Sequence, residues 1–158
     1  MTAQTIQTLL DGKELVDVLL TGFVEKHESP VRFYALLETL YLQCGGSLLR
    51  FGTVGDSGRM RIEVATAIEH TAALDDDMTP ALTSIRQQML RDPDGANVIA
   101  ASKFWNPTDE VNSIVCSAAS IDLANGQHIF VDPSNHFGIQ VGGRELEESW
   151  SAARDGTS

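Results

Sequence analysis

Basic residues are scarce in this chain: 11 lysines and arginines stand against 22 aspartates and glutamates, so the formal net charge is −11 at pH 7. A field of this sign repels nucleic-acid phosphate and anionic lipid, and we therefore expect neither nucleic acid nor a membrane as a partner. The same field attracts cations. The charge thus favours a basic protein partner, although acidity can also serve solubility alone.

Cysteine is nearly absent, and the two that occur, Cys44 and Cys116, do not form a CxxC pair. Two buried thiols in a reducing compartment are the simpler interpretation; one disulfide, or a reactive thiol, stays open at this point. A chain of 158 residues can bury a core that needs no disulfide or metal for stability. We therefore expect no structural metal and no cofactor.

Long apolar runs are missing as well. The longest, residues 16–24, is interrupted by an aspartate and falls short of the ~20 residues that a membrane-spanning helix needs. The first 30 residues are acidic where a signal peptide would be basic, so we expect a cytoplasmic protein. The sequence contains no repeat or linker, and we expect one domain over residues 1–158 with a loose tail at 154–158.

Helical spacing is found in several segments. Asp11 and Glu14 have the spacing of a capping box, and apolar rows follow over residues 15–24. Ser29-Pro30 predicts the start of a second helix, apolar almost all round, over residues 31–44. A third helix is expected after Thr79-Pro80. Residues 3–10 and 144–153 predict two further short helices.

Strand signals occupy much of the rest, at residues 48–53, 60–70, 98–105, 111–123, 127–132 and 138–141. Residues 60–70 alternate cleanly, as in a half-buried antiparallel strand, and residues 111–123 are small or apolar on both faces, as in a central strand. The element order αα-ββ-α-ββββ-α predicts an α+β fold. Its centre would be a six-stranded, mainly antiparallel sheet with the N-terminal helices packed on one face.

This order of elements resembles two superfolds. It is similar to the cone-shaped nuclear-transport-factor-2-like fold, whose bent sheet often encloses a pocket, and to the profilin or roadblock type of sheet-and-helix sandwich. The resemblance covers element order alone and brings no residue motif with it. Because one fold hosts many functions, it implies at most a pocket.

Candidate catalytic groups are few. His70 falls on the apolar face of its predicted strand, and His70 and Asp132 are the candidates for a general base. Cys44, His128 and Asp132 follow the chain order of a papain-like or transglutaminase-like triad. However, positions 128 and 132 of one strand are roughly 13 Å apart, too far for one side chain to orient the other. The sequence contains no phosphate-binding glycine loop and no nucleophile elbow.

Candidate binding residues are an acidic cluster, Asp75, Asp76 and Asp77, and the aromatic pair Phe104-Trp105. The cluster lacks the spacing of a calcium loop, so no metal is expected there; it either compensates a helix dipole or faces a basic partner. The aromatic pair is either the edge of the core or an exposed anchor for a partner.

The missing catalytic motifs favour a non-enzymatic, cytosolic protein-binding module with an acidic surface, such as a bacterial immunity protein, secretion chaperone or adaptor. The residues expected to contact the partner are Asp75, Asp76, Asp77, Phe104 and Trp105. The alternative is a small-molecule pocket protein or an isomerase, cyclase or hydratase of the nuclear-transport-factor-2-like fold, using His70 or Asp132. A homodimer formed through the apolar second helix, residues 31–44, or through the solvated face of the sheet is compatible with either.

Overall fold

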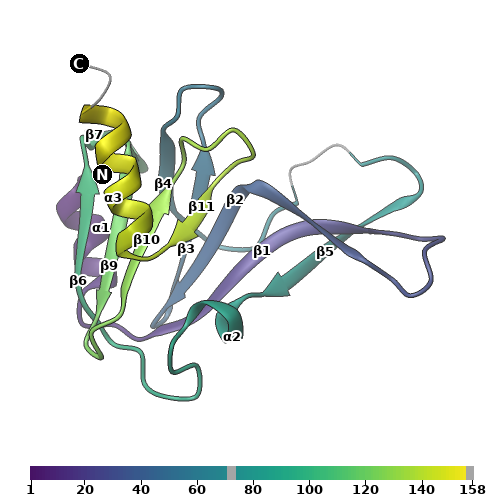
Figure 1. Cartoon of the computed structure of the whole chain (residues 1–158), viewed down its shortest axis with the longest axis horizontal. Helices are drawn as coiled ribbons and strands as arrows, with labels where there is room; N and C mark the ends of the chain where they lie inside the picture. The colour runs from purple at the N-terminus through teal and green to yellow at the C-terminus, as the bar shows by residue number, and fades with distance from the viewer. Residues whose placement is uncertain (71–73, 156–158) are drawn as a thin grey trace.

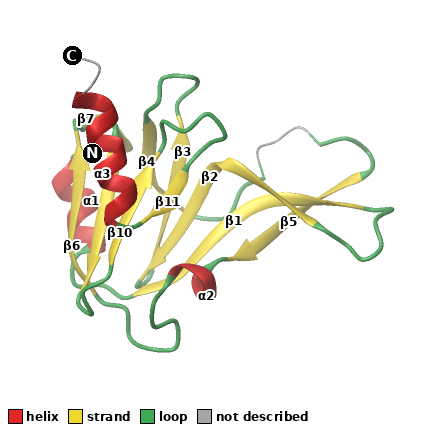
Figure 2. Ribbon diagram, viewed as in Figure 1, coloured by secondary structure: helices red, strands yellow, loops and turns green. Residues whose placement is uncertain are grey.

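The computed structural model describes residues 1–70 and 74–155, and antiparallel sheets dominate it (Figure 1, Figure 2). In chain order the elements are α1 (Ala3–Leu10), β1 (Leu15–Glu25), β2 (Phe33–Cys44), β3 (Ser47–Thr53), β4 (Met60–Ala65), β5 (Met78–Ser84), α2 (Arg86–Met89), β6 (Ile99–Trp105), β7 (Thr108–Asp109), β8 (Ser113–Cys116), β9 (Ala118–Leu123), β10 (His128–Asp132), β11 (Gln140–Gly142) and α3 (Arg144–Asp155). A seven-stranded sheet has the order β5-β1-β2-β3-β4-β8-β7, and a four-stranded sheet has the order β11-β10-β9-β6.

The expected α+β class with antiparallel pairing is therefore confirmed, whereas the single six-stranded sheet and the order αα-ββ-α-ββββ-α are wrong. The two long helices expected over residues 15–24 and 31–44 are the strands β1 and β2. In β1 the register shifts twice against β2, between Leu15 and Asp17 and between Leu20 and Gly22. Each shift interrupts the period of two, so the apolar residues no longer alternate and instead match helical spacing.

In β2 the sequence shows no alternation of apolar and polar residues, for another reason. Leu40, Tyr41 and Leu42 are all buried, so both faces of the strand are covered and no polar face is left to mark the alternation. Gly45, the residue after the segment expected to be helical, has φ +56 in the two-residue turn that joins β2 to β3. A glycine with positive φ occurs both after the last turn of a helix and in a two-residue hairpin turn, so the glycine alone does not distinguish the two.

Two further segments differ from expectation. Thr79-Pro80 begins no helix but lies within β5, and a one-turn helix α2 follows the strand. The strand expected over residues 60–70 ends at Ala65, which pairs with Leu48 at the start of β3, and residues 66–70 form no strand. Residues 111–123 divide at Ser117 into β8 and β9. Both occupy interior positions, one in each sheet, as the small and apolar composition predicts.

The two sheets enclose one apolar core. Side chains from β1, β2, β3, β4 and β8 meet side chains from β6, β9 and β10, and α1 contributes Ile6 and Leu10. Helix α3 covers the outer face of the small sheet, where Trp150 packs on Phe130 and Trp105. The short helices expected at 3–10 and 144–153 are thus confirmed. Arg154 and Asp155 continue α3 and are no loose tail, and residues 156–158 lie outside the described residues.

A three-stranded arm projects from the two-sheet body. It consists of residues 22–25 of β1, residues 33–35 of β2, and β5, with β1 in the middle (Figure 1). Strand β5 is an edge of the large sheet. The Lys26 N–H donates to Asp77 and the Ile85 N–H donates to Val18, so the alternate residues 78, 80, 82 and 84 direct their backbone groups away from β1.

Pro80 therefore faces the open edge, where its missing N–H removes one donor that another strand would need. This is the position at which proline is tolerated in a sheet, and it blunts the edge against pairing with another chain.

We expect Pro80→Val to promote self-association, because the substitution restores an outward N–H in the centre of an exposed strand. Thr79→Val is the control: it places the same side chain at the neighbouring position of the same strand, but the N–H of residue 79 already faces β1 and no outward donor is added. Sedimentation velocity over a range of concentrations should show oligomers for Pro80→Val only. A monomer at every concentration for both variants would contradict the blunting role of Pro80.

Candidate functional site

The arm begins at a large bulge in β2. Leu20 pairs with Leu40, and the next pair along the ladder is Gly22 with Ala35, so Thr21 alone stands opposite the four residues 36–39. Gly22 is required here: a Cβ on it would lie 2.1 Å from the Tyr34 carbonyl oxygen and 2.7 Å from the Phe33 ring. The bulge separates the part of the hairpin that packs in the core from the part that forms the arm.

A loop of residues 133–139, which we call the strap, crosses the bulge. The Ile139 N–H donates to the Leu37 carbonyl at 2.6 Å, and the Ile139 side chain is buried in the core. Gly138 has φ +116, and a Cβ on it would lie 2.5 Å from the same carbonyl oxygen. The close approach explains why a glycine occupies this position, and it fixes the root of the arm to the body.

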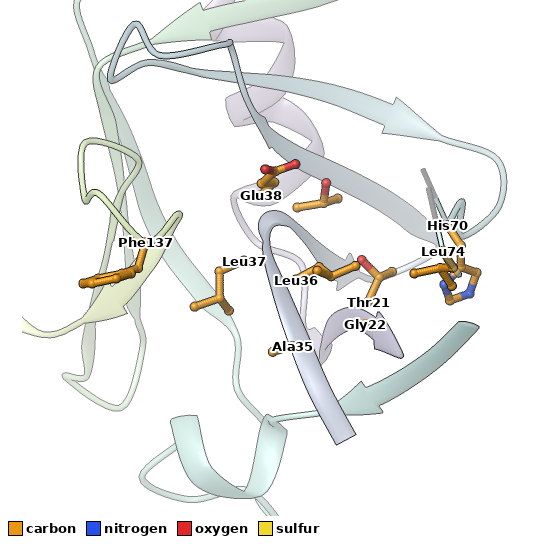
Figure 3. Close-up of a pocket in the computed structure, with 10 residues that line it drawn as sticks. Thr21, Gly22, Ala35, Leu36, Leu37, Glu38, His70, Leu74 and Phe137 are labelled. Carbon is orange, nitrogen blue, oxygen red and sulfur yellow. The ribbon is translucent and has the colours of Figure 1, made fainter. Parts of the chain in front are cut away.

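Two hollows open on either side of the strap. One of about 520 Å³ is lined by Thr21, Gly22, residues 35–39, His70, Leu74 and Phe137. Another of about 580 Å³ is lined by Glu38, residues 53–58 in part, and residues 133–138. Figure 3 shows Glu38, His70 and Phe137 at separate places around the first hollow, with Leu36 and Leu37 between them. Glu38 and His70 are therefore not placed side by side as a catalytic acid and base would be.

The arm presents an apolar row across its three strands. Phe23 pairs with Tyr34 on one side and with Pro80 on the other, so the three side chains share one face. The rings of Phe23 and Tyr34 stack with centroids 5.0 Å apart. Met78 and Leu82 flank Pro80 on the same face because side chains two positions apart on a strand point the same way. We call this surface the ladder face; none of its five residues is buried.

Acidic residues gather at the tip of the arm. Asp75, Asp76 and Asp77 lie exposed in the turn that precedes β5, next to the turn between β1 and β2. The Lys26 ammonium donates to the Asp76 carbonyl, and His27 lies 3.3 Å from Asp77. The acidic cluster predicted from the sequence is thus brought beside the ladder face. It precedes a strand, so it compensates no helix dipole.

The two candidate bases are far from forming a catalytic pair. His70 is exposed on the rim of the first hollow, beyond the end of β4 rather than on the apolar face of a strand. Asp132 is buried at the end of β10, where its Oδ1 accepts hydrogen bonds from the Ser134 N–H at 2.8 Å and the Ser134 hydroxyl at 2.6 Å. This closes an Asx turn at the start of the strap. Asp132 therefore has a structural role, which is to stabilise the turn into the strap.

The aromatic pair Phe104-Trp105 lies inside the molecule. Phe104 is 8% exposed and belongs to the core between the sheets. Trp105 points to the opposite face of β6, where it meets Phe130 and Trp150 under α3 and Lys103 lies 4.4 Å from its ring centre. Of the two interpretations of this pair, the structure favours the edge of the core. The ladder face carries two other aromatics, Phe23 and Tyr34, and both are half-buried.

His128 belongs to neither a triad nor a metal site. Its imidazole is 6% exposed and lies between two carboxylates, with Nδ1 2.5 Å from Asp122 and Nε2 2.9 Å from Glu147 of α3. Both ring nitrogens are thereby occupied, which leaves none to accept a proton from a nucleophile. Instead the ring ties α3 to the small sheet. Within the described ranges no group of three or more histidine, cysteine or acidic side chains is arranged to hold a metal ion.

Both cysteines are buried in the core as free thiols, and burial raises the pKa of each to about 12. A raised pKa keeps the sulfur protonated and unreactive at neutral pH. The papain-like arrangement of Cys44, His128 and Asp132 is therefore wrong on chemical grounds. The interpretation of two buried thiols is the one that the structure supports.

We expect the native protein to resist Ellman's reagent. With a pKa of about 12, only about one in ten thousand of each thiol is ionised at pH 8, and the core excludes the reagent. Absorbance at the thionitrobenzoate band should show no fast reaction in buffer and two thiols per chain in denaturant. Rapid labelling of either Cys44 or Cys116 in the native state would overturn the burial of these groups.

We expect His128→Ala to lower the free energy of unfolding by about 1–3 kcal/mol, because Asp122 and Glu147 lose the donor between them. His136→Ala, at an exposed position of the strap, is the control and should change little. The chain has two tryptophans, Trp105 and Trp150, and both lie at the α3 contact, so tryptophan fluorescence during urea unfolding measures the effect. Equal stability of the two variants would contradict the role of His128 in joining α3 to the small sheet.

Comparison with protein-family models, with curated proteins and with solved structures finds no match. The two superfold resemblances gain no support, and the element order on which they rested is not the order that the structure has. None of the helices in the described part of the chain is long and apolar enough to cross a membrane. The proposed function therefore follows from the arm and its surroundings.

Proposed function

We propose that the chain is a non-enzymatic protein-binding module that holds its partner with the arm. One observation carries the proposal: a stacked aromatic and aliphatic face, with Phe23, Tyr34 and Leu82 in adjacent rows, stands on a projecting sheet without being buried. An apolar patch of this kind on a polar protein marks an interaction site more often than a structural accident. Aromatic side chains supply most of the contact energy in such sites.

The charge around the arm supports a basic partner. Glu25, Glu28 and the three aspartates 75–77 surround the tip, against Lys26 and Arg32. Lys26 donates to a carbonyl of this cluster, and Arg32 lies 4.9 Å from the centre of the Tyr34 ring. The tip is therefore net anionic. It would attract a cationic surface and raise the rate of encounter, most strongly at low salt.

The alternative of a small-molecule pocket or enzyme has less support. Buried apolar side chains from both sheets form one cluster in the space between them, where the alternative would need a ligand cavity. The hollows beside the strap are open to the surface, and Asp132, one of the two candidate bases, is committed to the strap turn. A role as an immunity protein, secretion chaperone or adaptor in the cytoplasm is the form of binding function that we propose.

A photoreactive benzoylphenylalanine at position 82 should cross-link to another protein in cells that produce the full chain. Position 64 on β4 is the matched control, because Val64 is 44% exposed and Leu82 is 46% exposed on the same large sheet. We expect a discrete cross-linked band from position 82 that weakens when salt is raised in a lysate, and none from position 64. Equal yields at both positions would contradict the proposal, and so would a cross-link to a second copy alone.

A further inference from the structure

We infer that the segment received by the ladder face is a basic amphipathic α-helix of another protein, an inference that rests on the proposed function. The ladder face offers two ways of docking, along the open edge of β5 or across its side chains. Addition of a strand at the edge is hindered by Pro80, which has no N–H to offer in the centre of the strand. A partner therefore meets the side chains and not the backbone edge.

The dimensions of the face suit a helix. Three hydrogen-bonded strands place the two outer strands about 10 Å apart, which is close to the diameter of an α-helix. Met78, Pro80 and Leu82 extend over about 13 Å along β5, the length of between two and three helical turns. A helix with apolar residues at i, i+3 or i+4, and i+7 would cover Phe23, Pro80 and Leu82, because a sheet face is buried most completely by one helix laid on it.

The charges select a basic helix. Glu25 stands opposite Met78 at the distal end of the ladder face, and Glu28 accepts a hydrogen bond from the Tyr34 hydroxyl at 2.7 Å. The aspartates 75–77 continue the same anionic border around the tip. Arg32 already lies over the Tyr34 ring, which shows that this edge of the face attracts a cationic side chain. Lysine or arginine flanking the apolar stripe of a helix would find carboxylates at the tip.

A second copy of the chain fits this surface poorly. Each copy has a net charge of −11, and pairing two arms would bring two acidic tips together. Two of the chain's own arginines, at the start of β4, are already occupied: Arg61 binds Glu110, and Arg59, the residue before the strand, donates to the carbonyls of Asn106 and Val115. We therefore expect the complementary charge to come from a different protein.

The test uses three fluorescent peptides of about five helical turns and the full chain. The first places leucine on one face and lysine elsewhere. The second has the same composition in an order that scatters the leucines around the helix. The third replaces every lysine with glutamate. We expect the first to bind, with anisotropy rising to saturation and affinity falling as salt is raised, and the other two to bind at least about tenfold more weakly.

Leu82→Asp and Val64→Asp separate contact from charge, because both add one negative charge to the large sheet. The added charge at position 82 lies nearer to the bound lysines, so attraction alone would favour Leu82→Asp over Val64→Asp. A loss of affinity of about tenfold for Leu82→Asp alone therefore locates the helix on the ladder face. Thermal melts confirm that both variants fold. Equal affinity of the amphipathic and scattered peptides, or of the two variants, would overturn the inference.

Two outcomes separate this inference from the proposed function. If position 82 cross-links to another protein in cells but the lysine-leucine peptide does not bind, the arm remains a binding site and the basic helix is rejected. If sedimentation shows a dimer that Leu82→Asp dissolves, the occupant of the ladder face is a second copy and the inference is also rejected. If position 82 gives no cross-link and the lysine-leucine peptide does not bind, the inference and the proposed function are both rejected.

Discussion

The interruption of the β1–β2 ladder opposite Thr21 is the constraint on which the rest of this structure depends. On one side of it the two strands lie in the large sheet with their apolar side chains in the core, and on the other they leave the body with β5 beside them. Four residues of β2 opposite one of β1 turn the hairpin, as bulges do, and free the Leu37 carbonyl for the strap. The strap in turn holds the bulge to the small sheet. A bulge alone would let the arm bend easily. The hydrogen bond from Ile139 to Leu37 links the bulge to the small sheet and thereby restricts the orientation of the arm.

An exposed apolar sheet is hazardous unless its pairing is limited, and the arm shows how this chain limits it. Pro80 removes an edge donor, and the acidic tip repels copies of the chain. The stacked pair Phe23 and Tyr34 contributes about 1 kcal/mol to holding the arm together, which is modest beside what a buried row would give. These features are consistent with a surface kept available for a partner at some cost in stability.

The groups that suggested chemistry instead hold the fold together. Asp132 closes the turn into the strap, His128 joins α3 to the small sheet, and the cysteine thiols fill the core. Asp132 accepts two hydrogen bonds from Ser134, and both ring nitrogens of His128 have a carboxylate partner. A buried polar group needs such partners whatever its function, so its presence in a sequence is weak evidence for catalysis.

The sequence by itself determined the fold class, the antiparallel pairing and the two short helices at the ends, because these depend on local signals: strong alternation in residues 60–65 and a terminal amphipathic stripe. It favoured two free thiols but left a disulfide open, and the structure decided for the thiols. It also located the acidic cluster at 75–77. Tertiary structure alone decided that β1 and β2 are strands, since bulges erase their alternation and burial on both faces hides it. For the same reason the ladder face could not be predicted: Phe23, Tyr34 and Pro80 are distant in the chain, and only the pairing of three strands brings them into one row.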